Sequence, residues 1–160
     1  MDIDTLLIRE VVHALKRQEL MLATAESCTG GWVAQVVTSV AGSSEWFERG
    51  FVAYTNLAKR EMLGVKTMIL SRYGAVSEQC ARAMAEGALA HSHAQVALAI
   101  TGIAGPSGGT SEKPVGTVCF AWAGKKRDTQ SRKQVFSGDR ESVRRQAVTA
   151  ALQGVLDFVR

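Results

Sequence analysis

The chain has 160 residues, of which 46% are apolar, and its formal net charge is +4. This length predicts one domain, residues 1–160, that can bury a core without metal or disulfide support. The sequence has no run of the roughly 18 to 20 apolar residues that a membrane span needs, which excludes a membrane-spanning segment. The start Met1-Asp2-Ile3-Asp4 is acidic where a signal peptide would be basic, so we expect a cytoplasmic protein.

Cysteine spacing and the distribution of charge limit the ligands that the chain can bind. Cys28, Cys80 and Cys119 form no C-x-x-C pair, so we expect reduced thiols and neither a disulfide framework nor a metal site. Basic residues concentrate in the C-terminal part of the chain. This asymmetry fits either an anionic partner or, over residues 125–133, the solvated tip of a hairpin.

The first third of the chain predicts a helix, a strand and a second helix. Apolar residues recur at helical spacing over residues 4–18, with Asp4 as the N-cap. A short apolar run follows at residues 20–25. Two glycines and a mostly apolar stretch at residues 32–40 come next, which predicts a strand, a tight turn and a helix.

The middle of the chain alternates in the same way. Residues 50–55 carry β-favouring side chains and predict a strand, and a helix is expected to begin near Asn56 and to carry Lys59. Ser77 is a suitable cap for an alanine-rich helix over residues 78–90.

The last third begins with a continuous apolar run at residues 96–100, which is typical of a strand buried on both faces. A glycine-rich loop, residues 101–109, follows it. Residues 115–123 and 129–136 predict a hairpin, and a final helix is expected over residues 139–159.

Helices that alternate with strands, together with one late β-hairpin, predict a three-layer α/β/α domain with a mixed, mostly parallel sheet. In such sheets ligands bind beyond the carboxyl ends of the strands. The loops after Ala25 and Ile100 both leave the sheet at such an end. We therefore expect these two glycine-rich loops to share one site.

Ser27 is the first candidate nucleophile. A serine on a strand-to-helix turn is exposed and rigidly held, and the backbone N–H groups that follow it can hold an oxyanion. The spacing fits equally well a serine that only caps the helix. Cys28 is a rival nucleophile, because a thiol at a helix N-terminus can have a lowered pKa, but we favour Ser27 once its partners are considered.

A serine nucleophile needs a base. His13, His91 and His93 all lie away from the glycine-rich loops, so a Ser-His-Asp triad fits poorly. Lys59 can serve if burial and the start of its helix lower its pKa. The alternative is an ordinary exposed helical lysine.

Two features fit the binding of a phosphate. The loop Thr101 to Gly109 resembles a phosphate cradle in composition, although it matches no standard phosphate-binding motif. Arg140, Arg144 and Arg145, near the start of the last helix, can clamp a phosphate or can be ordinary surface charges.

Six stretches of the chain stand out together in a fixed order. They are Ala25 to Gly31, Gly42 to Gly50, Tyr54 with Asn56 and Lys59, Gly74 to Glu78, Gly102 to Pro106, and Lys113 to Val118. In this order they resemble the CinA C-terminal domain family over nearly the whole chain. The length resembles the stand-alone form, which lacks the larger N-terminal domain of other members.

The resemblance implies a nicotinamide-nucleotide amidohydrolase, an enzyme that hydrolyses nicotinamide mononucleotide to nicotinic acid mononucleotide and ammonia without a metal or other cofactor. It implies a Ser-Lys pair at Ser27 and Lys59, with proton transfer either direct or through Tyr54. Backbone N–H groups of residues 29–31 are expected to hold the oxyanion. The expected substrate-binding residues are Glu26, Thr29, Gly30, Gly31, Asn56, Thr101, Gly102, Gly105, Arg140, Arg144 and Arg145.

The alternative function is that of a catalytically silent paralogue that binds nucleotides or nucleic acid in competence or DNA damage. The sequence has few aromatic residues and a moderate charge, which argues against nucleic acid as the partner. We therefore expect a small nucleotide as the ligand, no membrane partner, and a homo-oligomer, taken as a dimer.

Overall fold

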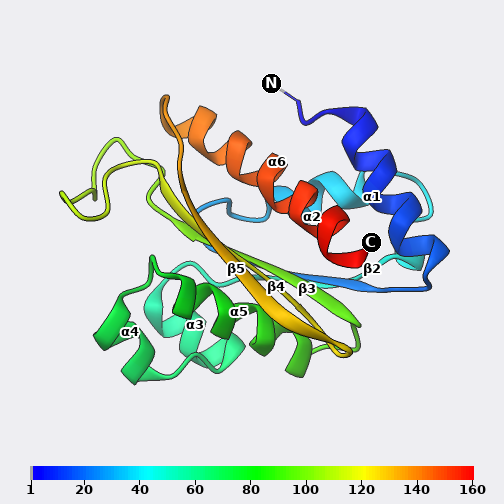
Figure 1. The fold of residues 1–160 in the computed structure, drawn as a ribbon, viewed down its shortest axis with the longest axis horizontal. Coiled ribbons are helices and arrows are strands. Elements are labelled where there is room, and N and C mark those ends of the chain that lie inside the picture. Colours follow the sequence, from blue (N-terminus) through cyan, green and yellow to red (C-terminus); the bar gives the residue numbers. More distant parts are fainter. Residues whose placement is uncertain (1) are drawn as a thin grey trace.

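Five strands form one mixed sheet in the computed structural model, which describes residues 2–160 (Figure 1). Their order across the sheet is β2-β1-β3-β4-β5. The strands are β1 (Leu22–Glu26), β2 (Phe47–Val52), β3 (Val96–Gly102), β4 (Thr117–Gly124) and β5 (Arg127–Val135). β2, β1 and β3 pair in parallel, whereas β4 is antiparallel to both β3 and β5. The predicted mixed, mostly parallel sheet with a late hairpin is confirmed.

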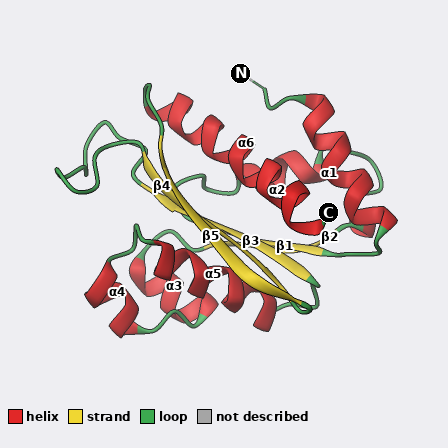
Figure 2. Ribbon diagram, in the orientation of Figure 1, coloured by secondary structure: helices red, strands yellow, loops and turns green. Residues whose placement is uncertain are grey.

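Helices cover both faces of this sheet and make the three predicted layers (Figure 2). On one face lie α1 (Thr5–Arg17), α2 (Trp32–Thr38) and α6 (Arg140–Val159). On the other lie α3 (Asn56–Leu63), α4 (Thr67–Tyr73) and α5 (Glu78–Ala90). None of the helices in residues 2–160 has the length and apolar character needed to span a membrane.

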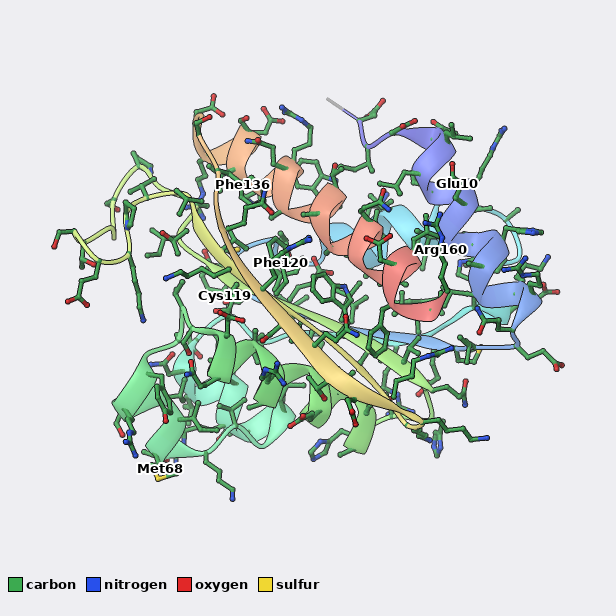
Figure 3. The ribbon with its side chains drawn as sticks, viewed as in Figure 1. Glu10, Met68, Cys119, Phe120, Phe136 and Arg160 are labelled. Atoms are coloured by element: carbon green, nitrogen blue, oxygen red, sulfur yellow. The ribbon has the colours of Figure 1, made fainter. Side chains whose placement is uncertain are left out.

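Side chains alternate along the strands, because successive residues of a strand point to opposite faces. The cluster on the α1, α2 and α6 face includes Leu98 and Ile100 of β3 and Phe120 of β4. Figure 3 shows Phe120 and Phe136 on the α6 side of the sheet, where their rings meet edge to face with centroids 6.2 Å apart. The cluster on the α5 face receives Ala97 and Ala99 from the same strand β3.

Several predicted boundaries need correction. β2 covers residues 47–52 rather than 50–55, because its pairing with β1 begins at Phe47 and its last partner is Val52. Residues 53–55 then leave the sheet and lead into α3. Helix α4 was not predicted, and its N-cap Lys66 makes no side-chain capping bond. The sequence has none of the usual capping residues Ser, Thr, Asp or Asn at that position, so the start of the helix was not recognised.

Candidate active site

Ser27 directly follows β1 and still takes part in the sheet through its backbone. Its N–H donates to the carbonyl of Ile100 on β3 at 3.0 Å. The side chain is 7% exposed, and its Oγ donates to the carbonyl of Tyr54 at 3.3 Å. Alternation along β1 puts Ala23 and Ala25 on the α5 face, and Ser27 continues that series toward α3.

Lys59 points from α3 to Ser27. Helix α3 is capped by Thr55, whose Oγ1 accepts from the N–H of Ala58 at 3.0 Å. Lys59 is 2% exposed, and its Nζ lies 3.0 Å from Ser27 Oγ and 3.0 Å from the Tyr54 carbonyl. The alternative of an exposed helical lysine is therefore wrong.

The environment of Lys59 favours a neutral amine. Burial lowers the pKa of Lys59 below its ordinary value of 10.5, because a charged ammonium loses its hydration there. The ion pairs found in residues 2–160 do not include this lysine. A lysine without a carboxylate partner, in hydrogen-bond contact with a serine, has the arrangement of a general base.

Tyr54 contributes its backbone rather than its phenol to this pair. Its carbonyl accepts from both Ser27 and Lys59, whereas its side chain is 55% exposed and its hydroxyl accepts from Arg140 Nη2 at 3.1 Å. Lys59 reaches Ser27 without an intermediate group. The expected relay through the Tyr54 phenol does not fit this geometry.

The pair opens into a cavity of about 230 Å³. Its walls come from the ends of β1 and β3, the start of α3 and the segment before α5. The lining residues are Ser27, Cys28, Tyr54, Thr55, Asn56, Lys59, Ala75, Val76, Thr101 and Gly102. Each of the two glycine-rich loops therefore contributes residues to the wall of this cavity.

Cys28 borders the cavity, but its side chain packs into the core cluster on the α1, α2 and α6 face. Burial raises the pKa of this thiol to about 11, against a smaller lowering by the charge of Arg144. A thiol with this pKa is protonated near neutral pH and is a poor nucleophile. The geometry therefore favours Ser27 over Cys28.

Glu26 and Thr29 hold the turn after β1 instead of facing the cavity. The Glu26 carboxylate, 1% exposed, accepts from Thr29 Oγ1 at 2.6 Å and from the N–H groups of Val33 and Ala34 at 2.9 and 3.1 Å. It thereby caps α2, whose own N-cap Gly31 offers no side chain. Both side chains were expected to bind substrate, and neither lines the cavity.

The backbone of the same turn is arranged for an oxyanion. Gly30 and Gly31 have positive φ angles of 59° and 102°, which favour glycine. The Gly30 N–H already donates to the Ser27 carbonyl at 3.0 Å. Among the hydrogen bonds of residues 2–160, none uses the N–H of Cys28 or Thr29. These two donors are better placed for the role than Gly30.

Only the start of the second glycine-rich loop reaches the cavity. Thr101 is buried, and its Oγ1 donates to the Ala75 carbonyl at 2.9 Å. Gly105 lies further along, with φ of +85° and no room for a Cβ beside Val115. The rest of the loop extends beyond the sheet, as the yellow-green segment of Figure 1 shows. The predicted cradle of residues 101–109 is thus reduced to Thr101 and Gly102 at the cavity.

The three arginines of α6 go to three different places. Arg140 donates to the Gly105 carbonyl at 2.8 Å and to the Tyr54 hydroxyl, at the rim of the cavity. Arg144 donates to carbonyls of the turn after β1. Arg145 lines a separate hollow between β5 and α6. The three arginines, any of which was expected to hold the phosphate, therefore do not lie together, and Arg140 is the one that contacts the exposed side chain of a cavity residue, Tyr54.

Three cavity residues were not expected from the sequence. Thr55 was recognisable only as a polar residue before a helix, and Ala75 and Val76 have no side-chain chemistry that marks a site. Their signals were their place before the capping residue Ser77 and within the stretch Gly74 to Glu78. Within residues 2–160, no group of three His, Cys, Asp or Glu side chains could hold a metal ion.

Known proteins resemble this chain over almost its whole length. The family model described as the CinA C-terminal domain matches residues 4–159. The nicotinamide-nucleotide amidohydrolase PncC of Escherichia coli strain K12 is 55% identical over 92% of this chain and 89% of that protein. The protein of the same name from Pseudomonas putida is 49% identical over 99% of this chain and 98% of its own length.

Solved structures give the same result. The competence/damage inducible protein CihA from Agrobacterium tumefaciens superimposes with a TM-score of 0.94 at 44% identity, over 96% of this chain and 94% of that one. A CinA superfamily protein from Klebsiella pneumoniae gives a TM-score of 0.92 at 37% identity, over 96% and 95% of the two chains. This chain belongs to the CinA C-terminal domain family.

Proposed function

We propose that the chain hydrolyses the carboxamide of nicotinamide mononucleotide, which yields nicotinic acid mononucleotide and ammonia. The observation that carries the chemistry is the 3.0 Å contact between Lys59 Nζ and Ser27 Oγ in a cavity. The printed names of the relatives from Escherichia coli and Pseudomonas putida support the substrate. With this substrate we place the reaction in the cytoplasm.

The first half of the reaction forms an acyl-enzyme. Neutral Lys59 takes the proton of the Ser27 hydroxyl while Oγ attacks the carboxamide carbon. The carbonyl oxygen becomes an oxyanion, which the N–H groups of Cys28 and Thr29 stabilise. The carbon–nitrogen bond then breaks, the proton on Lys59 passes to the leaving nitrogen, and ammonia departs from a Ser27 ester.

The second half repeats these steps with water. Lys59, again neutral, takes a proton from a water molecule whose oxygen attacks the ester carbon. The ester bond to Oγ breaks, Ser27 recovers its proton from Lys59, and the nicotinate carboxyl leaves. The Tyr54 carbonyl accepts from the Lys59 amine in both halves of the reaction, and from the Ser27 hydroxyl only while that hydroxyl carries its proton.

The rest of the cavity sets where the nucleotide lies. With the carboxamide beside Ser27, the ring and ribose extend along Thr55, Asn56 and Thr101. Arg140 at the rim is the cation that can meet the phosphate, and its contacts to Gly105 and Tyr54 hold it there. We assign the phosphate to Arg140 alone.

The test is ammonia release from nicotinamide mononucleotide by the purified protein. We expect turnover in the wild type, loss in Ser27→Ala, and near-normal turnover in Cys28→Ala, which keeps the backbone N–H and removes only the thiol. Activity that survives in Ser27→Ala would exclude the serine mechanism. No ammonia from the wild type, with substrate binding intact, would exclude the proposed reaction.

A further inference from the structure

Arg144 lies behind the turn that carries Ser27. Its Nε donates to the carbonyl of Cys28 at 3.0 Å, and its Nη2 donates to the carbonyl of Thr29 at 3.2 Å. These are the two residues that follow the nucleophile. The arginine and the turn are more than a hundred residues apart in sequence, so only the packing of α6 brings them together.

These contacts fix the direction of the backbone in the turn. In a planar trans peptide the N–H points away from the carbonyl of the preceding residue. The Cys28 carbonyl faces Arg144, so the N–H of Thr29 points to the opposite side of the turn. Arg144 is not among the residues that line the cavity, whereas Ser27 and Cys28 are. The arginine therefore holds the turn from its outer side.

The arginine itself is held firmly. It lies between buried residues of α6, Val143 and Ala147, and its guanidinium stands 5.5 Å from the ring centre of Trp32, the first residue of α2. On the same side of the sheet, the Glu26 carboxylate binds Thr29 and the start of α2. The turn is thus fixed by a carboxylate that accepts from the Thr29 hydroxyl and from N–H groups at the start of α2, and by a guanidinium that donates to its carbonyls.

The charge of Arg144 also acts on the turn that follows Ser27. It is the largest of the influences that lower the pKa of Cys28, against the stronger effect of burial. A positive charge that stabilises an anion at the Cys28 side chain also favours negative charge elsewhere on the turn. No carboxylate pairs with Arg144 among the ion pairs of residues 2–160, and the opposing effect of the Glu26 charge on the Cys28 thiol is smaller than that of Arg144.

We propose that Arg144 is a positioning residue for amide hydrolysis: by binding the Cys28 and Thr29 carbonyls it fixes the peptide planes on both sides of Thr29 and keeps the Thr29 N–H directed at the developing oxyanion. This role rests on the proposed function and replaces the expected contact of Arg144 with phosphate. A guanidinium suits it because its planar donors reach two carbonyls at once, which an ammonium on a flexible stem does poorly.

The test compares Arg144→Gln and Arg144→Lys with the wild type. We expect Arg144→Gln to lower kcat by about 10- to 100-fold with little change in KM, because misaligned oxyanion donors act on the transition state rather than on substrate binding. Arg144→Lys should recover part of kcat. Arg9→Gln, which removes an exposed arginine of α1, is the matched control and should keep wild-type kinetics.

A second readout does not depend on the substrate. A fluorophosphonate reagent labels an activated serine and places its phosphoryl oxygen in the oxyanion site, so Arg144→Gln should label about tenfold more slowly than the wild type. Thermal unfolding shows whether each variant is folded. If Arg144→Gln is not folded, the labelling rate of the less disruptive Arg144→Lys is compared with that of the wild type instead.

The outcomes separate the two proposals. Equal labelling rates in the wild type and the folded Arg144→Gln variant would overturn the role of Arg144, as would a raised KM with unchanged kcat, which indicates a substrate contact. Wild-type protein that labels rapidly but releases no ammonia would overturn the proposed substrate. The role of Arg144 would then be tested by the labelling rates alone.

Discussion

The two faces of the sheet carry side chains of very different size. Toward α1, α2 and α6, strand β4 presents Phe120 and Trp122, which stack with centroids 5.9 Å apart. Toward α5, the same strand presents Ala121 and Ala123. Large side chains keep helices at a distance from a sheet, whereas alanines let a helix approach closely.

The small face is the one on which the proposed catalytic pair forms. Helix α5 lies on the alanines, and α3 packs so tightly against it that a Cβ on Gly87 would collide with the Leu63 carbonyl. This close packing brings Lys59 within 3.0 Å of Ser27. The large face supplies most of the bulky core instead. The small face therefore holds the proposed nucleophile and base, whereas the large face supplies the bulky core and, through Arg144 near the start of α6, the proposed positioning contact.

The largest effect is expected from the small face itself. Lys59→Met should lower kcat/KM by about 1,000-fold or more, because it removes the only proposed base and keeps the shape of the side chain. Unfolding in denaturant should show no loss of stability, since a desolvated amine is replaced by an apolar group. Ammonia release measures the first effect. Substantial residual activity would mean that another group takes the serine proton.

The next effect tests the large face. Trp122→Ala should cost about 3–5 kcal/mol of unfolding free energy, because it leaves a cavity between β4 and α6. Its Nε1 also donates to the Ala151 carbonyl at 3.1 Å, and this bond would be lost. Activity per folded molecule should stay at the wild-type level. A marked loss of kcat in the folded variant would show that this part of the large-face core also affects the site.

A matched pair of glycine substitutions sharpens the comparison. Gly87→Ala introduces a collision with the Leu63 backbone, and Gly154→Ala introduces one with the Trp122 ring. Each should destabilise by about 1–3 kcal/mol through overpacking. Only Gly87→Ala should also lower kcat, by up to about 100-fold, because a small shift of α3 misplaces the base. Equal losses of kcat in both variants would show that overpacking on either face of the sheet lowers kcat.

The smallest effect is a dependence on pH. Activity should rise with pH as Lys59 loses its proton, at a pKa below the ordinary 10.5. Between that lowered pKa and 10.5, the unfolded chain binds a proton at Lys59 that the folded one does not, so the wild type should gain stability with rising pH relative to Lys59→Met. The buried thiols, whose pKa is raised to about 11, oppose this gain above pH 9 in both proteins. Lys59→Met should lack this gain. Parallel stability curves for the two proteins, measured in denaturant over pH, would contradict a lowered pKa.

Local signals predicted much of the fold and part of the candidate site. Asp4 and Ser77 cap their helices as their residue types indicate. The rule that ligands bind beyond the carboxyl ends of parallel strands put the site beyond β1 and β3, where the cavity lies. Helix α4 lacks such a cap and was missed. Glu26 was expected to meet substrate because it neighbours Ser27, yet the alternation of β1 turns it toward α2.

The sequence by itself determined most of the helices and strands, because these follow from residue type and from periods of two and 3.6 residues. The tertiary structure decided which distant groups meet. It joined Lys59 to Ser27 across 32 residues and replaced the Tyr54 phenol with its carbonyl. It also separated Arg144 from Arg145, since neighbours on a helix point about 100° apart and only the packing of α6 fixes its rotation.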